Sequence, residues 1–89
     1  MRFTVTWKPS AENELDVEWM AASPDERARI TEAVRLAETM LRYNPETVGE
    51  SRSGGERIFF VSPLAFTIEI REPDRIVSVL SIHRMPEAE

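Results

Sequence analysis

One segment with a marked beginning and a marked end constrains this chain more than any other feature. It opens with "SPDE", in which Ser23 is a favoured N-cap, Pro24 suits the first helical position and Glu26 completes a Ser-x-x-Glu capping box. It ends at "NP", because Asn44 can take a left-handed C-cap and Pro45 prevents continuation. The apolar residues between these points recur at helical spacing, as Ile30, Ala33, Val34, Ala37, Met40 and Leu41. The sequence therefore predicts a long amphipathic helix that buries one face.

The residues before this helix predict a strand and a shorter helix. The stretch "RFTVTW" alternates in period two, with Phe3, Val5 and Trp7 on one side, which is typical of a half-buried strand. A helix then opens at Pro9. Its apolar positions are Ala11, Leu15, Trp19 and Ala22. We expect Trp7 and Trp19 to pack in the core or between helix and sheet. Because the link between the two helices is short, we expect them to pack as an antiparallel hairpin.

A glycine-containing loop and three strands are predicted after the long helix. The stretch "PETVGESRSGGE" is a loop by composition and lacks the Lys-Ser/Thr pair of a phosphate-binding loop. The apolar runs "RIFFVS", "AFTIEIRE" and "RIVSVLSIHR" each end at a proline and are joined by short turns, so neighbours should pair antiparallel. The predicted fold class is α+β in the order β-α-α-β-β-β, an antiparallel sheet with a helical hairpin on one face. Residues 1–89 are expected to form one domain.

The composition restricts the function classes. The chain carries 11 basic and 16 acidic residues, a net charge of −5, and its cations do not cluster. Strong direct binding to a nucleic-acid backbone needs several clustered cations and is therefore not expected. With no cysteine and one histidine, no metal site or other cofactor is expected. Neither a signal peptide nor an apolar run long enough to span a membrane is present, so a cytoplasmic protein without membrane contact is predicted.

Three landmarks make the chain similar to a known family. They are the opening "WKPSAENEL", the "NPET" that precedes the glycine loop, and the "HR" that ends the last strand. Over residues 2–85 this pattern resembles the RelE/ParE toxin superfamily of bacterial type II toxin–antitoxin systems. The resemblance implies a cognate antitoxin that wraps the helices and the sheet. It also implies one of two targets: RelE-like members cut mRNA on the ribosome, and ParE-like members poison DNA gyrase without a recognised hydrolytic site.

The nuclease residues of the family carry over incompletely. Arg84 matches the arginine that ends the last strand, Arg57 falls near the basic positions of the middle strands, and His83 could assist. Ala65 stands about where nucleases carry an arginine, and the tail "MPEAE" has no tyrosine. RNA cleavage needs a base, an acid and cationic stabilisation of the phosphorane, so the catalytic set Arg57, Arg84 and His83 is thin. A ParE-like toxin is therefore expected, with an endoribonuclease or a non-toxic binding module as alternatives.

The "HR" pair can be interpreted in three ways. Side chains alternate along a strand, so His83 and Arg84 should face opposite sides unless a bulge intervenes. In the structural interpretation one of them ends the strand in solvent and the other pairs with a sheet carboxylate such as Glu69. In the second, Arg84 alone contacts a target or the antitoxin, and in the third His83 takes part in catalysis.

The predicted contact residues for the antitoxin or the target are Phe59, Arg57 and Arg84. Phe59 and Phe60 are adjacent, so one of the two rings must face away from the core if the strand is regular. That outward ring would lie either under the antitoxin or under the glycine loop.

Overall fold

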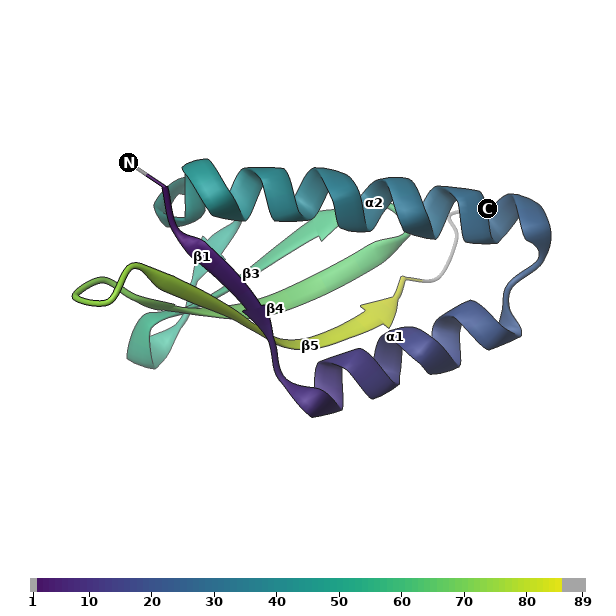
Figure 1. Ribbon diagram of the computed structural model, residues 1–89, viewed down its shortest axis with the longest axis horizontal. Coiled ribbons are helices and arrows are strands. Elements are labelled where there is room, and N and C mark those ends of the chain that lie inside the picture. The colour runs from purple at the N-terminus through teal and green to yellow at the C-terminus, as the bar shows by residue number, and fades with distance from the viewer. Residues whose placement is uncertain (1, 86–89) are drawn as a thin grey trace.

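The computed structural model describes residues 2–85 and contains seven main elements (Figure 1). They are β1 (Thr4–Trp7), α1 (Pro9–Ala21), α2 (Pro24–Tyr43), β2 (Glu50–Ser51), β3 (Glu56–Val61), β4 (Leu64–Arg71) and β5 (Ile76–Arg84). Two single-turn 3-10 helices, Pro45–Thr47 and Ser53–Gly55, flank β2 in the predicted loop. The predicted α+β class and element order are confirmed, with β2 as one additional short strand. No helix within residues 2–85 is long and apolar enough to cross a lipid bilayer.

The sheet is mixed, which corrects the fully antiparallel sheet expected from the sequence. Its strand order is β1-β5-β4-β3-β2, and the pairs from β5 through β2 are antiparallel as the short turns predict. The β1 strand, however, runs parallel to β5, with Thr4 opposite Ile76 and Trp7 opposite Val79. Two helices separate β1 from the other strands, so no hairpin turn fixes its direction.

The capping box predicted at the start of α2 is present. The Glu26 N–H donates to Ser23 Oγ at 3.2 Å, and the Ser23 N–H donates to Glu26 Oε1 at 2.8 Å. The end of the helix differs from the prediction, because Asn44 has φ −141° and ψ 50° and is not left-handed. Its N–H donates to the Met40 carbonyl at 2.8 Å, and Pro45 then opens a 3-10 turn. Proline therefore stops the helix without a left-handed cap.

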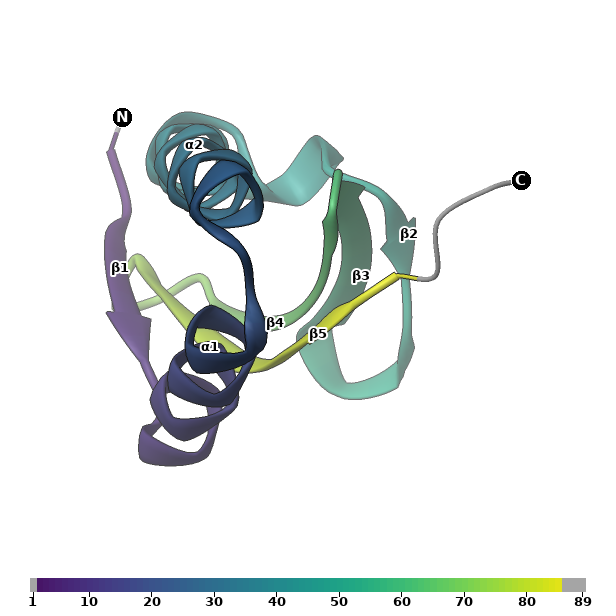
Figure 2. The same cartoon turned by 90° about the vertical axis from the view of Figure 1, so that its right-hand side faces the viewer.

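The two helices meet at their short link and diverge from it, so they do not form the closely packed hairpin expected (Figure 1). The α2 helix lies in the hollow of the curved sheet (Figure 2). The α1 helix runs beside the second half of β5, where the Glu14 carboxylate accepts the Ile82 N–H at 3.0 Å and Ser10 Oγ donates to the Leu80 carbonyl at 3.4 Å. These side chains satisfy backbone groups of β5 beyond the stretch that pairs with β1. These two hydrogen bonds therefore hold α1 beside β5 and away from α2.

The core lies between α2 and the sheet. Phe66 is fully buried at its centre, where its ring stacks on Phe59 with centroids 5.0 Å apart and meets the Trp7 ring edge-on at 6.5 Å. The other large side chains that are fully buried among the described residues are Ile30, Leu41, Pro45, Leu64, Ile68, Val77 and Val79. The inward faces of β1, β3, β4 and β5 therefore form one core with the buried residues of α2.

Candidate functional site

Arg84 ends β5 on the face of the sheet that carries α2. It stands opposite Leu64, which is buried in the core, and its guanidinium Nη2 donates to Glu26 Oε2 at 2.7 Å. Both side chains are mostly covered, at 25% and 31% exposure. The Ser23 N–H and then the Arg84 guanidinium hold the pKa of the Glu26 carboxyl below its ordinary value. One carboxylate thus caps α2 and fixes the last side chain of β5.

His83 faces away from Arg84, as the alternation of a regular strand predicts. It stands opposite Ala65 and is exposed, on the sheet face that α2 does not cover. The register shift between β4 and β5 falls between Thr67 and Ile68, several positions from the end of the strand. The bulge therefore does not bring His83 and Arg84 together.

The partner of Arg84 differs from the one that the structural interpretation named. Glu69 lies 3.8 Å from Arg71 on its own strand, whereas Arg84 pairs with Glu26 at the start of α2. Sequence reasoning missed Glu26 because 58 residues separate it from Arg84 and because its role in the capping box already accounted for it. The "Ser-x-x-Glu" motif contains the carboxylate that pairs with Arg84. The two side chains meet only because the end of β5 lies close to the start of α2 in the folded chain.

Arg57, near the start of β3, holds the loop that precedes the strand. Its Nε donates to the Val48 carbonyl at 2.6 Å and its Nη2 to the Gly49 carbonyl at 3.3 Å. Gly49 has φ 53°, and a Cβ there would lie 1.9 Å from the Ile58 carbonyl oxygen. The loop therefore lies directly on β3, which only glycine permits, and the Arg57 side chain fastens it.

Acidic side chains surround Arg57. A small hollow of about 200 Å³ beside it is lined by Glu46, Glu56 and Glu72 among other residues. A side-chain hydrogen bond with Glu46, together with burial and the nearby Glu46 charge, raises the pKa of the Glu72 carboxyl. Because phosphate is anionic, this hollow is an unfavourable place for an RNA backbone.

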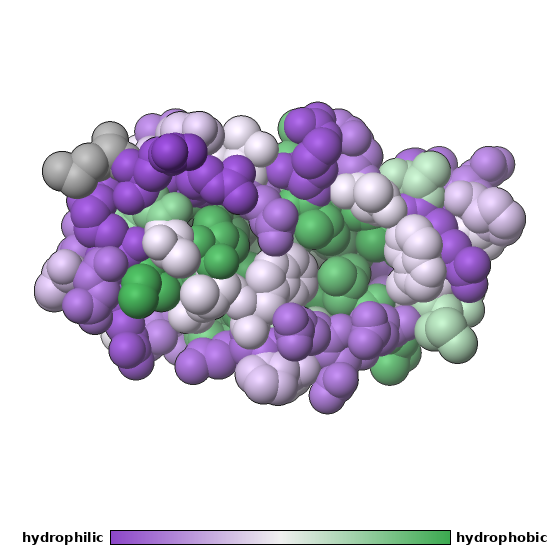
Figure 3. All heavy atoms as spheres, in the orientation of Figure 1, coloured by the Kyte–Doolittle hydropathy of each residue, from purple (hydrophilic) through white to green (hydrophobic). Residues whose placement is uncertain are grey.

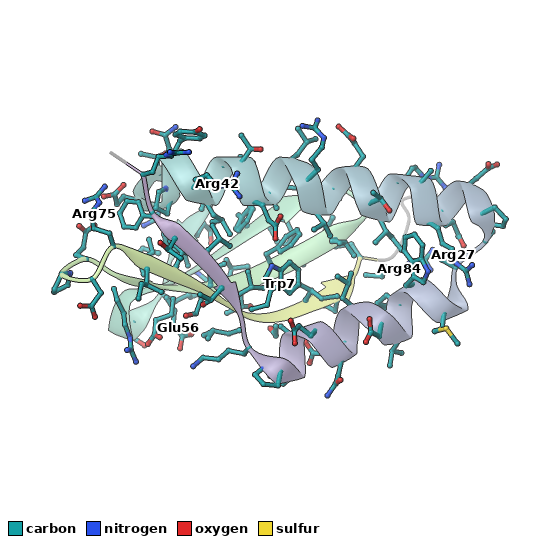
Figure 4. The ribbon with its side chains drawn as sticks, in the orientation of Figure 1. Trp7, Arg27, Arg42, Glu56, Arg75 and Arg84 are labelled. Carbon is teal, nitrogen blue, oxygen red and sulfur yellow. The ribbon has the colours of Figure 1, made fainter. Side chains whose placement is uncertain are left out.

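The structure does not bring the two arginines together. Arg57 stands opposite Ile68 and Arg84 opposite Leu64, four positions further back on β4. This separates their backbones by roughly 13 Å along the strands and by about 10 Å across two strand spacings. Figure 4 shows Arg84 toward the end of the molecule where the helices meet and Glu56, the neighbour of Arg57, toward the other end. The two guanidinium groups therefore cannot meet on one phosphate in this conformation.

Phe59 lies in the core, which corrects its expected role as a contact residue. Its ring is 2% exposed, whereas the Phe60 ring is 62% exposed on the opposite face of β3. The register places Phe60 opposite Ala65, and Ala65 opposite His83, so these residues form one row across the uncovered face of the sheet. The ring available to a partner on this strand is therefore that of Phe60.

The fold is shared with toxins of toxin–antitoxin systems. The chain aligns with a chain of the toxin–antitoxin complex RelBE2 from Mycobacterium tuberculosis at TM-score 0.75 and 18% identity, over 96% of this chain and 100% of that one. It aligns with a chain of the chromosomal ParDE system from P. aeruginosa at TM-score 0.72 and 15% identity, over 96% and 98% of the two chains. The isolated E. coli RelE toxin aligns at TM-score 0.60 and 13% identity, over 98% and 88%.

These likenesses establish the RelE/ParE toxin fold for this chain. They include both RelE and ParE proteins, so they do not assign the chain to either branch. No protein-family model matches the sequence, and neither does any curated protein.

Proposed function

We propose that this protein is the toxin component of a type II toxin–antitoxin module, acts in the cytoplasm and is neutralised by a cognate antitoxin. The likeness to toxin–antitoxin structures extends over nearly the whole chain and nearly the whole of each aligned partner, which supports this role. One of the aligned structures is the RelBE2 toxin–antitoxin complex, and another belongs to the ParDE toxin–antitoxin system, which supports a cognate antitoxin as the partner.

We further propose that the toxin acts as ParE-like proteins do, by binding its target. The supporting observation is that Arg57 and Arg84 both donate to acceptors of the protein itself, at separate places on the sheet. A nuclease needs cations that face the developing charge of the phosphorane and are not already bound to acceptors of the protein. Following the family resemblance, DNA gyrase is the proposed target.

The structure also does not place His83, the candidate general acid or base, beside Arg84. His83 lies on the opposite sheet face from Arg84, so one scissile phosphate cannot contact both side chains. Ala65 occupies the position beside it and contributes no cation. Binding without hydrolysis is therefore the function that this geometry supports best.

Co-expression with the small protein encoded beside the gene tests the antitoxin proposal. We expect the two proteins to purify as one complex at micromolar concentration, and we expect the free toxin to inhibit DNA supercoiling by gyrase. Separate elution of the two proteins would remove the support for a toxin–antitoxin module. A stable complex whose toxin leaves gyrase unaffected would retain the module and reject the target.

A further inference from the structure

One side of α2 faces α1 and lines a groove between the two helices. Val34 and Glu38 of α2 lie along a hollow of about 440 Å³ together with Asp16 of α1. A neighbouring hollow of about 310 Å³ shares Asp16 and Val34 and is also lined by Trp19. The Trp19 side chain is 38% exposed, although the sequence predicts it in the core or between helix and sheet. Figure 3 shows apolar residues open to solvent in this groove.

The opposite side of α2 carries a stripe of large apolar side chains. Leu36, Met40 and Tyr43 follow one another at the spacing i, i+4, i+7, so they share one face of the helix. Leu36 is two residues from both Val34 and Glu38, which places it about 160° around the helix from each. The three side chains are 41%, 37% and 49% exposed. This outer stripe (Leu36, Met40 and Tyr43) therefore neither joins the core nor lines the groove.

The outer stripe belongs to the one neutral segment of an acidic protein. The α2 helix carries four basic and four acidic residues, whereas the rest of the chain carries seven basic and 12 acidic residues and thus the whole net charge of −5. Two copies of an acidic protein repel each other at long range, and this repulsion is weakest where neutral surfaces approach. The same neutrality offers no net attraction to a strongly charged partner. These properties favour a second copy of this chain as the occupant of the stripe.

The residues along the stripe are complementary to themselves in the opposite direction. Arg29 lies seven residues before Leu36 and Tyr43 lies seven residues after it, so each is two turns from Leu36 on the same side of α2. Helices that pack along such a stripe cross at about 20° and stay in contact over several turns. In an antiparallel pair of α2 helices with a two-fold axis at Leu36, each Arg29 therefore lies opposite the Tyr43 of the second copy. A guanidinium over a tyrosine ring is favourable, and among residues 2–85 Arg29 has no ion pair to lose.

The positions between these contacts fit the same pairing. Glu32 lies four residues before Leu36 and Met40 four residues after it, so they also face each other across the two copies. The Glu32 carboxylate is bound by Arg35 of the same helix, which compensates its charge and leaves its methylene groups to pack against Met40. The Leu36 side chain meets its own copy at the axis.

We propose that two copies of this protein associate through antiparallel packing of the outer stripes of their α2 helices. The proposal goes beyond the proposed toxin function and does not depend on it. Because one helix pair makes a small interface, the dimer belongs at the weak end of specific association, with a dissociation constant on the order of 10 µM.

Single cysteines test the pairing directly, because the chain has none of its own. A two-fold axis at Leu36 places Leu36→Cys beside its own copy, within reach of a disulfide. In the full-length protein under mild oxidation, we expect Leu36→Cys to form disulfide-linked dimers at least about tenfold faster than Met20→Cys, since the pairing raises the local thiol concentration. Met20 is the matched control, because it is an exposed apolar residue of α1 outside the stripe. Equal rates for the two variants would overturn the proposal.

Charge changes at the two ends of the stripe test the register. Sedimentation of the full-length wild-type protein should show a monomer–dimer equilibrium. Tyr43→Lys places a second cation opposite Arg29 and should weaken the dimer about tenfold. Combining it with Arg29→Glu places opposite charges at both contacts, which should return the dissociation constant to within about threefold of wild type. A double variant as weak as Tyr43→Lys alone would overturn the antiparallel pairing.

The outcomes separate this inference from the proposed function. Wild type that stays monomeric up to about 500 µM would overturn the dimer. If in that case Leu36→Glu weakens binding to the small protein encoded beside the gene, the stripe belongs to that protein instead. A wild type that dimerises but does not bind the neighbouring protein would support the dimer and reject the toxin–antitoxin function.

Discussion

The sheet and the helix pair of this protein differ in whether their functional candidates are bound within the chain or open to solvent. On the sheet, Arg57 and Arg84 are both engaged by carbonyl or carboxylate oxygens of the chain. Between the helices, Asp16 and the exposed ring of Trp19 line an open groove. The two arginines that match catalytic positions of the resembling family are therefore already bound within the fold, whereas the groove between the helices remains open to solvent. The following predictions test that contrast, from the largest expected effect to the smallest.

Gly49→Ala should have the largest effect, because it breaks the contact between the loop and β3. The new Cβ would lie 1.9 Å from a backbone oxygen at a residue with φ 53°, and we expect a loss of about 3 kcal/mol of unfolding free energy. Gly54→Ala is the control, since that residue has φ 70° with nothing within 4 Å and should lose only about 1 kcal/mol. Urea denaturation measures both, and equal losses would show that the loop does not lie against β3.

Arg57→Ala tests whether the arginine of β3 is structural. Removing the side chain leaves the Val48 and Gly49 carbonyls without their donor, which should cost about 1.5–3 kcal/mol of unfolding free energy. Arg52→Ala is the matched control, because Arg52 forms an exposed pair with Glu50 that should contribute roughly 0–1 kcal/mol. A stable Arg57→Ala protein with altered activity would instead assign Arg57 to the function.

Ser23→Ala tests the start of α2, on which the position of Glu26 and therefore of Arg84 depends. The substitution removes the acceptor for the Glu26 N–H and should cost about 0.5–2 kcal/mol of unfolding free energy. The midpoint of chemical denaturation checks this expectation. A midpoint equal to that of wild type would contradict the capping role.

The smallest predicted effect is a pH dependence of opposite sign at two glutamates. The folded state raises the pKa of Glu72, so its ionised form costs stability once the pH exceeds that pKa. Glu72→Gln should therefore raise the denaturation midpoint at about pH 7 and not at about pH 4. The folded state lowers the pKa of Glu26, whose contribution is present at neutral pH and is lost as the pH falls through the folded pKa. Glu26→Gln should accordingly lower the midpoint at about pH 7, and shifts of the same sign in both variants would refute this account.

Local signals were sufficient to predict the two helices and the four longer strands of this fold. The capping box at Ser23 and the prolines after each C-terminal strand each act within a few residues, and the structure confirms the elements that they delimit. The direction of β1 was not predictable in this way, because no turn connects β1 to a neighbouring strand. Nor was the divergence of the helices predictable, because it depends on hydrogen bonds of Ser10 and Glu14 to the distant β5.

The candidate site was less predictable than the fold. In "RIFFVS" apolar residues occupy both alternating sets, so the period-two pattern cannot say whether Phe59 or Phe60 faces the core. Arg84 forms a salt bridge with Glu26, and the two residues are close only because β5 packs near the start of α2. Sequence position alone therefore identified the two arginines but not their partners.

Cleavage of mRNA on programmed ribosomes is the most direct test of the claim that the sheet arginines are structural. The assay compares wild-type protein with Arg84→Ala, with antitoxin absent from both. Because Arg84 is held by Glu26, and His83 lies on the other face, we predict no cleavage by wild type. Site-specific cleavage by wild type that Arg84→Ala reduces roughly 10²–10³-fold would contradict the account and make Arg84 a catalytic residue.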